Sequence, residues 1–147
     1  MNDFLDDAIL KLAEEARVEL SKETPSARKA EMGQFLTPPS VACMVASMVE
    51  ELEDKIISIL DPGAGAGSLS ATLVLRILNR KKRPSAIHLT AFEIDPKYAA
   101  KLANTLTLLK QRCKDLGVAF MSSLRTEDFI EAYSTSERSL FTKSLPS

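Results

Sequence analysis

A short apolar run that ends in an acid and is followed by three alternate glycines constrains the fold more than any other feature of the chain. The run covers residues 56–60 and ends in Asp61, and Gly63, Gly65 and Gly67 follow before a helical pattern begins. An apolar run of this length predicts a buried strand. Because glycine has no Cβ, a glycine-rich turn at the carboxyl end of a strand lets backbone N–H groups approach a ligand closely. The feature therefore predicts a strand, a ligand-binding turn and a helix in succession.

A second apolar run ends in a carboxylate as well. It extends from Ala86 to Phe92 and is followed by Glu93, 26 residues after Gly67. An acid at the tip of the second strand of such a unit can accept hydrogen bonds from ribose hydroxyls. Together the glycine turn and this acid predict a binding site for a nucleoside cofactor.

Hydrophobic periodicity alternates between strand and helix along most of the chain. Strands are expected over residues 56–60, 87–93 and 118–121, and helices over residues 3–22, 41–52, 68–79 and 96–116. Ser40 and Asp95 are the expected N-caps of the second and fourth helices, and Glu127–Ile130 is expected to form a turn. Because strands alternate with helices, we expect parallel strands and right-handed crossovers. The fold class is thus α/β, a partial doubly wound (Rossmann-like) fold with an amino-terminal helical extension.

Composition sets bounds on the class of protein. The 147 residues, 45% of them hydrophobic, suit one domain with a sizeable core. A net charge of −1 argues against a stand-alone nucleic-acid binder. No apolar stretch approaches the roughly 20 residues that a membrane span needs, and the amino terminus does not resemble a secretory signal. Cys43 and Cys113 lack metal-like or redox-like spacing, so we expect a cytoplasmic protein without a metal site or membrane contact.

The glycines alone leave several interpretations open, and Asp61 separates them. Any tight strand-to-helix turn favours glycine, and the nicotinamide fingerprint G-x-G-x-x-G requires glycine where Ser68 stands. A carboxylate at position 61 repels a dinucleotide phosphate but attracts a cation. S-adenosylmethionine carries cationic amino and sulfonium groups, and Glu93 serves the ribose of either cofactor. The sequence therefore favours S-adenosylmethionine, and a nicotinamide oxidoreductase is the weakest alternative.

Two motifs resemble those of adenine-specific (N6) DNA methyltransferases of type II restriction–modification systems. Residues 61–67, DPGAGAG, are similar to the glycine turn that most S-adenosylmethionine methyltransferases share. Residues 33–38, GQFLTP, are similar to a more specific loop that lies upstream of the turn in these enzymes. The resemblance covers roughly residues 30–130. It implies a methyltransferase fold, S-adenosylmethionine as the methyl donor, and adenine in DNA as the methyl acceptor.

The resemblance also implies roles for individual residues. Thr37 would contact the carboxylate of the cofactor's methionine, Glu93 would bind the ribose, and Ile94 would lie beside the adenine. Asp128 and Phe129 match the pair that holds the adenine by its amino group and its face. The expected cofactor-binding residues are Thr37, Asp61, Pro62, Gly63, Gly65, Glu93, Ile94, Asp128 and Phe129.

The catalytic loop of the family is absent from these 147 residues. It reads Asn-Pro-Pro-Tyr or Asp-Pro-Pro-Tyr, and it holds the flipped target base in the resembling enzymes. Without it no catalytic residue is assigned, and we expect the chain alone to have little activity and to bind DNA weakly or not at all. Two alternatives stay open: a non-catalytic S-adenosylmethionine-binding or regulatory module, and a methyltransferase portion that acts on RNA or protein.

The expected organisation has three parts. Residues 1–32 form an amino-terminal helical segment, residues 33–134 the partial S-adenosylmethionine-binding domain, and residues 135–147 a tail or incomplete fourth strand. In the resembling enzymes the fourth strand lies beside the first. Without that neighbour the first strand is a sheet edge, and we expect self-association through it.

A basic cluster at Arg76 and residues 80–83 is the one feature that suggests nucleic acid by charge. It falls at the carboxyl end of a predicted helix, where positive charge complements the helix dipole. It also lies opposite the carboxyl ends of the strands, so we expect a structural role.

Overall fold

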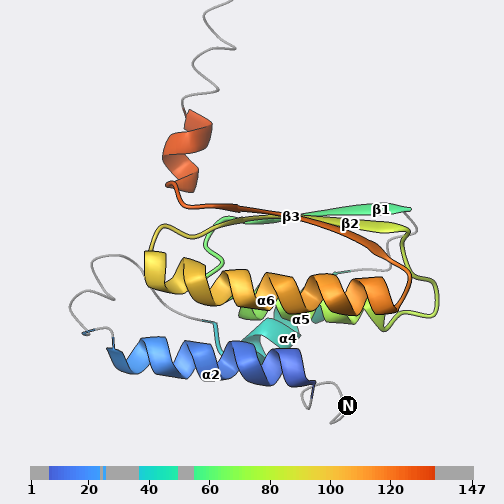
Figure 1. Ribbon diagram of the computed structural model, residues 1–147, viewed down its shortest axis with the longest axis horizontal. Coiled ribbons are helices and arrows are strands. Elements are labelled where there is room, and N and C mark those ends of the chain that lie inside the picture. Colours follow the sequence, from blue (N-terminus) through green and yellow to red (C-terminus); the bar gives the residue numbers. More distant parts are fainter. Residues whose placement is uncertain (1–6, 24, 26–36, 50–54, 135–147) are drawn as a thin grey trace, which may run out of the picture.

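The computed structural model describes residues 7–23, 25, 37–49 and 55–134, and these form a sheet backed by helices (Figure 1). The strands are β1 (Ile56–Asp61), β2 (Ala86–Phe92) and β3 (Ala119–Arg125). The helices are α2 (Ala8–Glu23), α4 (Pro39–Ser47), α5 (Ser68–Leu78) and α6 (Pro96–Asp115). All strand pairs are parallel, in the order β1-β2-β3. The prediction of a partial Rossmann-like α/β fold is confirmed.

The register of the sheet brings the carboxyl ends of the three strands to one edge. Asp61, the last residue of β1, pairs with Ala91, and Phe92 pairs with Arg125 of β3. Glu93 therefore lies just beyond the level of Asp61. The polar residues that end the first two strands are neighbours, as expected for adjacent parallel strands.

Helices α5 and α6 cover one face of the sheet, and α2 and α4 lie beyond them (Figure 1). Both crossovers run in the same direction along the sheet, and right-handed connections then place both helices on the same face. Buried apolar side chains fill the space between the sheet and the helices: Val74, Ile77, Leu78, Ile87, Leu89, Leu102 and Leu109.

Among the described residues, the opposite face of the sheet has no helix over it except at its carboxyl edge, where the helical turn over residues 129–134 packs on Phe92 (Figure 1). Side chains alternate across a strand, so every second residue points to that face. Ile56 and Leu60 of β1 are 54% and 49% exposed there, and Met121 of β3 is 58% exposed. The sheet thus has one buried face and one face with exposed apolar side chains.

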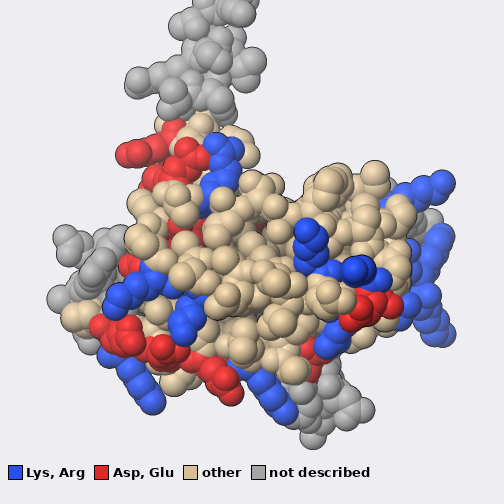
Figure 2. Space-filling view, in the orientation of Figure 1, with Lys and Arg blue, Asp and Glu red and all other residues tan. Residues whose placement is uncertain are grey.

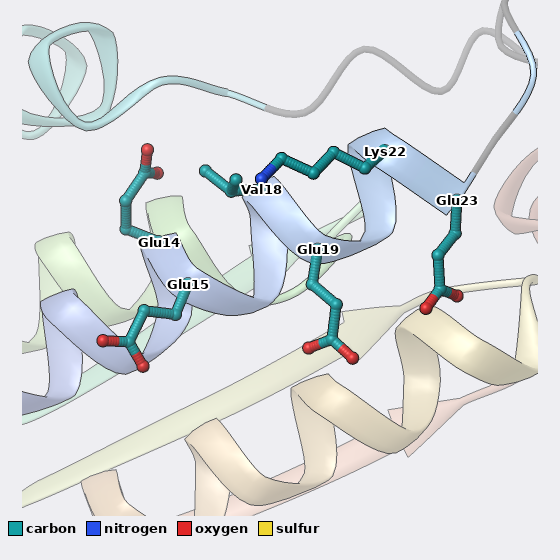
Figure 3. Close-up of a pocket in the computed structure, with 6 residues that line it drawn as sticks. All are labelled: Glu14, Glu15, Val18, Glu19, Lys22 and Glu23. Atoms are coloured by element: carbon teal, nitrogen blue, oxygen red, sulfur yellow. The ribbon is translucent and has the colours of Figure 1, made fainter.

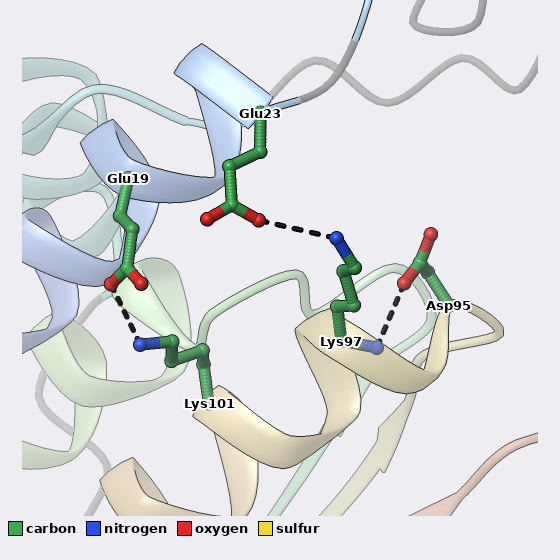
Figure 4. A network of polar contacts seen from close by, with 5 residues as sticks. All are labelled: Glu19, Glu23, Asp95, Lys97 and Lys101. Atoms are coloured by element: carbon green, nitrogen blue, oxygen red, sulfur yellow. Dashed lines mark hydrogen bonds and ion pairs between the residues drawn. The ribbon is translucent and has the colours of Figure 1, made fainter.

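Ion pairs as well as apolar contacts hold α2 against α6. Lys101 pairs with Glu19 at 2.7 Å and Lys97 with Glu23 at 3.2 Å (Figure 4). Both lysines lie in the first turns of α6, directly after Asp95. The side chain of Asp95 accepts a hydrogen bond from the backbone N–H of Lys97 at 2.9 Å, so the predicted N-cap is confirmed.

The start of α4 differs from the prediction. Ser40 was expected to be the N-cap, but the N-cap is Pro38, in an extended conformation, and the helix begins at Pro39. Proline at the first helical position has a suitable φ and lacks an N–H that would otherwise need a partner. The helix also ends at Ser47 and not at residue 52, with Met48 as its C-cap. Residues 50–54 lie outside the described part.

Candidate cofactor site

The glycine turn after β1 is shaped by two left-handed glycines. Gly65 and Gly67 have φ of 56° and 89°. A Cβ on Gly67 would lie 2.8 Å from Leu102 Cδ1 and 3.1 Å from Thr105 Cγ2 of α6. Position 67 therefore requires glycine both for its backbone conformation and for the close approach of α6.

Backbone and side-chain hydrogen bonds fix the rest of this turn. The Ala64 N–H donates to the Phe92 carbonyl at 2.9 Å, and the Gly67 N–H donates to the Ala64 carbonyl at 2.8 Å. From α6, the Thr105 hydroxyl donates to the Ala66 carbonyl at 2.9 Å. The turn is thus joined to both β2 and α6, which sets its shape before any ligand binds.

Glu93 links the turn after β1 to the loop after β2. Its Oε2 accepts from the Gly65 N–H at 2.9 Å, and its Oε1 accepts from the Asp95 N–H at 2.8 Å. The side chain is buried, and burial raises the pKa of Glu93 above its ordinary value of 4.5. The hydrogen bonds from the two backbone N–H groups lower this pKa, and the negative charges of Asp95 and Asp61 raise it. Each carboxylate oxygen can accept a second hydrogen bond, so the group can still bind two hydroxyls.

Asp61 and Thr37 line a small hollow beside the turn. Asp61 is 8% exposed, and its Oδ2 accepts a hydrogen bond from the Ser70 hydroxyl of α5 at 2.5 Å. Thr37 comes from the segment before α4, which packs against α5. The hollow is lined by Thr37, Asp61, Gly63, Ala64, Gly65, Ala66, Ser68 and Leu69.

The structure therefore brings some of the predicted residues together and leaves others apart. The hollow, of about 40 Å³, suits a small polar group and not a whole nucleoside. Glu93 reaches its wall through Gly65, whereas Asp128 is not among the lining residues. Of the expected cofactor-binding side chains, Thr37 and Asp61 therefore line this hollow, and Glu93 and Asp128 lie outside its lining.

Pro62 and Gly63 form the exposed rim of the turn. A Cβ on Gly63 would meet no atom within 4 Å. Nothing among the described residues requires glycine at position 63, so a ligand that comes close to the backbone is a physical reason for it. Residues 33–36 of the predicted upstream loop lie outside the described part.

The loop after β3 carries the adenine-binding residues that the resemblance implies. Asp128 and Phe129 are half-buried, and Ile94, after β2, is 50% exposed. Asp128 Oδ1 accepts from the Glu131 N–H at 3.0 Å, and a helical turn follows over residues 129–134. The turn predicted over Glu127–Ile130 is wrong in its second half, because Asp128 caps a helical turn there.

Sequence reasoning missed two hydroxyl residues that shape the site. Ser70, which is 1% exposed, binds Asp61, and Thr105, which is fully buried, binds the glycine turn. Both lie within helices at positions that a periodic pattern assigns only to packing. Their partners are 9 and 39 residues away in sequence, so no local signal identifies them.

Two other surface features lie away from this site. Positive side chains gather at the end of the molecule where the strands begin (Figure 2), and the turn from α5 to β2 carries Arg80, Lys81, Lys82 and Arg83. Arg83 Nε donates to the Leu78 carbonyl at 2.5 Å, which caps the end of α5. Within the described part of the chain, an open groove along α2 is lined by residues of that helix, mostly by glutamates such as Glu14, Glu15 and Glu19 (Figure 3).

Comparison with known proteins assigns the chain to a family. Residues 20–137 match the family model described as N-6 DNA Methylase, which is more than half of the chain. The chain belongs to the N-6 DNA methylase family. This confirms the resemblance to adenine-specific DNA methyltransferases, and S-adenosylmethionine is the cofactor that membership implies.

Curated relatives share these residues but are much longer. Over 118 residues the chain is 35% identical to the type II methyltransferase M.BsuBI of Bacillus subtilis, which is 78% of this chain and 22% of that protein. Over 105 residues it is 32% identical to the type II methyltransferase M.PstI of Providencia stuartii, which is 71% of this chain and 20% of that protein. The chain spans about a fifth of the length of these relatives.

One solved structure of low similarity also matches. It is a Listeria monocytogenes protein named as a class I S-adenosylmethionine-dependent methyltransferase, with 22% identity and a TM-score of 0.45. The match covers 79% of this chain and 34% of that one. Separately, no helix within the described residues has the length and apolarity to cross a membrane.

Proposed function

We propose that this chain forms the S-adenosylmethionine-binding portion of a DNA adenine N6 methyltransferase. The observation that supports this best is the pairing of the glycine turn with Glu93. The carboxylate lies at the tip of β2 and contacts Gly65, so a ribose bound by Glu93 would lie against the turn. Membership of the N-6 DNA methylase family supplies the reaction class.

The residues present fit the chemical groups of the cofactor. In this proposal the ribose hydroxyls donate to Glu93, and Asp61 attracts the amino group of the methionine end. Thr37 binds the carboxylate of that end in the small hollow, which is the right kind of space for such a group. Pro62 and the open backbone of Gly63 lie along the cofactor. The cofactor, when bound, supplies a sulfonium methyl group for transfer.

The charge of the site favours this cofactor over a dinucleotide. Asp61 and Glu93 are both acidic and buried, and they lie on adjacent strand tips. A pyrophosphate placed against the turn would be repelled by Asp61, whereas the cationic methionine end is attracted. The site residues otherwise used for adenine are Ile94, Asp128 and Phe129.

The direct test is calorimetric titration with S-adenosylhomocysteine, the product form of the cofactor. The wild-type chain is expected to bind it, and Glu93→Gln is expected to bind about tenfold or more weakly, because an amide has one acceptor oxygen where the carboxylate has two. Asp115→Asn is the matched control, since Asp115 is exposed at the end of α6, where its side chain accepts a hydrogen bond from Gln111. Absence of binding by the wild-type chain, or equal affinity of both variants, would contradict the proposal.

Methyl transfer is proposed to need residues other than these 147. Incubation with radiolabelled S-adenosylmethionine and unmethylated DNA is expected to give little incorporation by the chain alone. Strong incorporation into DNA would overturn this. Parallel reactions with RNA and protein acceptors test the alternative substrates, and binding of the cofactor without transfer to any acceptor would favour a regulatory module.

We further propose self-association through β1. Within the described residues β1 pairs with β2 on one side only, and its Ile56 and Leu60 are exposed on the uncovered face. An edge strand with apolar neighbours can add the equivalent strand of a second copy. Sedimentation velocity is expected to show concentration-dependent oligomers that Leu60→Lys reduces. A monomer at all concentrations would contradict the proposal.

A further inference from the structure

Three aromatic rings form a continuous cluster beyond the Glu93 site. Phe92, the last residue of β2, contacts Phe129 edge-on, with ring centroids 5.2 Å apart and planes at 78°. Phe129 contacts Tyr133 at 4.8 Å with planes at 47°, and Tyr133 lies 6.2 Å from Phe92. Phe129 and Tyr133 are four residues apart on the helical turn after β3, so both rings lie on the same side of it.

The cluster is anchored at its inner end and open at its outer end. Phe92 is 1% exposed, and its backbone carbonyl accepts the hydrogen bond from Ala64 of the glycine turn. The Arg125 guanidinium lies 5.4 Å from the centroid of the Phe92 ring and is ion-paired with Glu127. Tyr133, in contrast, is 47% exposed. The inner ring is therefore enclosed, and Tyr133 forms the boundary of the cluster with solvent.

The position of Phe129 depends on its two ring neighbours. It is half-buried and lies between Phe92 and Tyr133, both within contact distance of aromatic pairs. The T-shaped contact with Phe92 restricts one side of the Phe129 ring. A ring that stacks on a planar base must keep a constant orientation. The other neighbour, Tyr133, restricts the orientations that the Phe129 ring can adopt.

We propose that Tyr133 is a positioning residue for a bound purine, acting through Phe129. This inference rests on the proposed S-adenosylmethionine site, in which Phe129 contacts the adenine. Tyr133 packs against Phe129 and holds its ring in the orientation that receives the base. The ring of Tyr133 supplies this effect through its contacts with Phe129 and Phe92.

The experiment compares two ligands that differ only by the purine. S-Adenosylhomocysteine carries the base, and S-ribosylhomocysteine has the same ribose and amino-acid parts without it. Calorimetry is carried out on wild type, Tyr133→Ala, Tyr133→Phe and the control Ile130→Ala. Ile130 is 70% exposed on the same helical turn and outside the aromatic cluster, so its replacement reports any general loss of that turn. Thermal unfolding of each variant shows that it is folded.

Tyr133→Ala is expected to bind S-adenosylhomocysteine about fivefold more weakly than wild type, with affinity for S-ribosylhomocysteine unchanged. Tyr133→Phe and Ile130→Ala are expected to bind as wild type does. Wild-type affinity in Tyr133→Ala, an equal loss in Ile130→Ala, or an equal loss for both ligands would overturn the inference. Failure of the wild-type chain to bind S-adenosylhomocysteine at all would instead contradict the proposed function.

The absence of tryptophan provides a second measurement. The chain has two tyrosines, and Tyr98 is 2% exposed in the core. In a Tyr98→Phe background the emission comes from Tyr133 alone. S-Adenosylhomocysteine is expected to change this emission and S-ribosylhomocysteine is not; equal responses to both ligands would contradict the inference.

Discussion

The turn after β1 and the loop after β3, which we propose bind the same cofactor, are held in different ways. The first is fixed by its backbone, through Gly65 and Gly67 with positive φ and through hydrogen bonds to β2 and α6. The second is held by side chains, in the contacts of Phe129 with Phe92 and Tyr133. The turn after β1 is mostly buried, and the loop after β3 is half-exposed.

This difference separates two kinds of contribution. The buried part of the turn, residues 64–67, belongs to the packed core, so changes there are expected to affect the stability of the fold as well as the proposed binding. The aromatic loop lies at the boundary with solvent, so changes there are expected to affect the proposed recognition of the base with little effect on the core. Single-residue variants in each region test this division.

Gly67→Ala is expected to lower the free energy of unfolding by about 3 kcal/mol. A Cβ at position 67 would be 2.8 Å from Leu102, and alanine is strained at a φ of 89°. Chemical denaturation measures the change. A stability within 1 kcal/mol of wild type, on the order of ordinary surface variants, would show that the turn is not fixed by α6.

The pH dependence of Glu93 is expected to have opposite signs for binding and for stability. Because burial raises its pKa, the folded chain holds the proton more tightly than the unfolded chain, so the free energy of unfolding falls as pH rises from 4.5 through the raised pKa. Affinity for S-adenosylhomocysteine is expected to increase over the same interval, by up to about tenfold per pH unit, because the ionised group accepts from both ribose hydroxyls.

Glu93→Gln should remove both pH effects, which calorimetry and denaturation over this pH interval can measure. Affinity that is constant with pH in the wild-type chain would contradict a direct contact between Glu93 and the ribose.

Gly63→Ala offers a matched contrast to Gly67→Ala within the same turn. A Cβ at position 63 meets no protein atom within 4 Å, so stability is expected to be unchanged. Affinity for S-adenosylhomocysteine is expected to fall about fivefold, because the methyl group occupies space against which the ligand lies. Calorimetry and thermal unfolding measure the two quantities. Unchanged affinity would place the ligand away from the rim of the turn.

Ser70→Ala is expected to have the smallest effect. Its hydroxyl donates a hydrogen bond to one carboxylate oxygen of Asp61. This bond fixes the orientation of the carboxylate and so directs its other oxygen toward the proposed ligand. Loss of this bond is expected to weaken binding of S-adenosylhomocysteine about threefold. A control is Thr107→Ala, whose exposed hydroxyl binds only within α6. Equal affinity in the two variants would remove Ser70 from the site.

Much of the fold follows from local signals in the sequence. The strands, the glycine turn and the Asp95 cap were predicted because hydrophobic periodicity, glycine and capping residues act over a few neighbouring positions. The Ser40 cap was wrong because two consecutive prolines shift the start of α4. The Asp128 turn was partly wrong because the same residue type caps a helix and begins a turn.

The site was less predictable than the fold. Glu93 and Asp61 were proposed as site residues because each directly follows or ends a predicted strand, and the structure has them at the ends of β2 and β1. The hydrogen bonds of Ser70 and Thr105 depend on how helices pack, and the tilt of Phe129 depends on a ring four residues along an unpredicted helical turn. Such contacts arise from three-dimensional packing and leave no pattern in the sequence. The proposed cofactor-binding roles of all nine residues (Thr37, Asp61, Pro62, Gly63, Gly65, Glu93, Ile94, Asp128 and Phe129) remain predictions.

The parallel register of β1 and β2 has a consequence for how such a protein can change over evolution. Inserting one residue within either strand would turn the acid at its carboxyl end, Asp61 or Glu93, to the other face of the sheet. The connection over residues 79–85 runs from the end of α5 to the start of β2, at the edge of the sheet opposite to Asp61 and Glu93. Its length can therefore vary without moving either acid. Insertions and deletions are therefore expected to accumulate there in homologous chains, while the spacing within each strand is preserved.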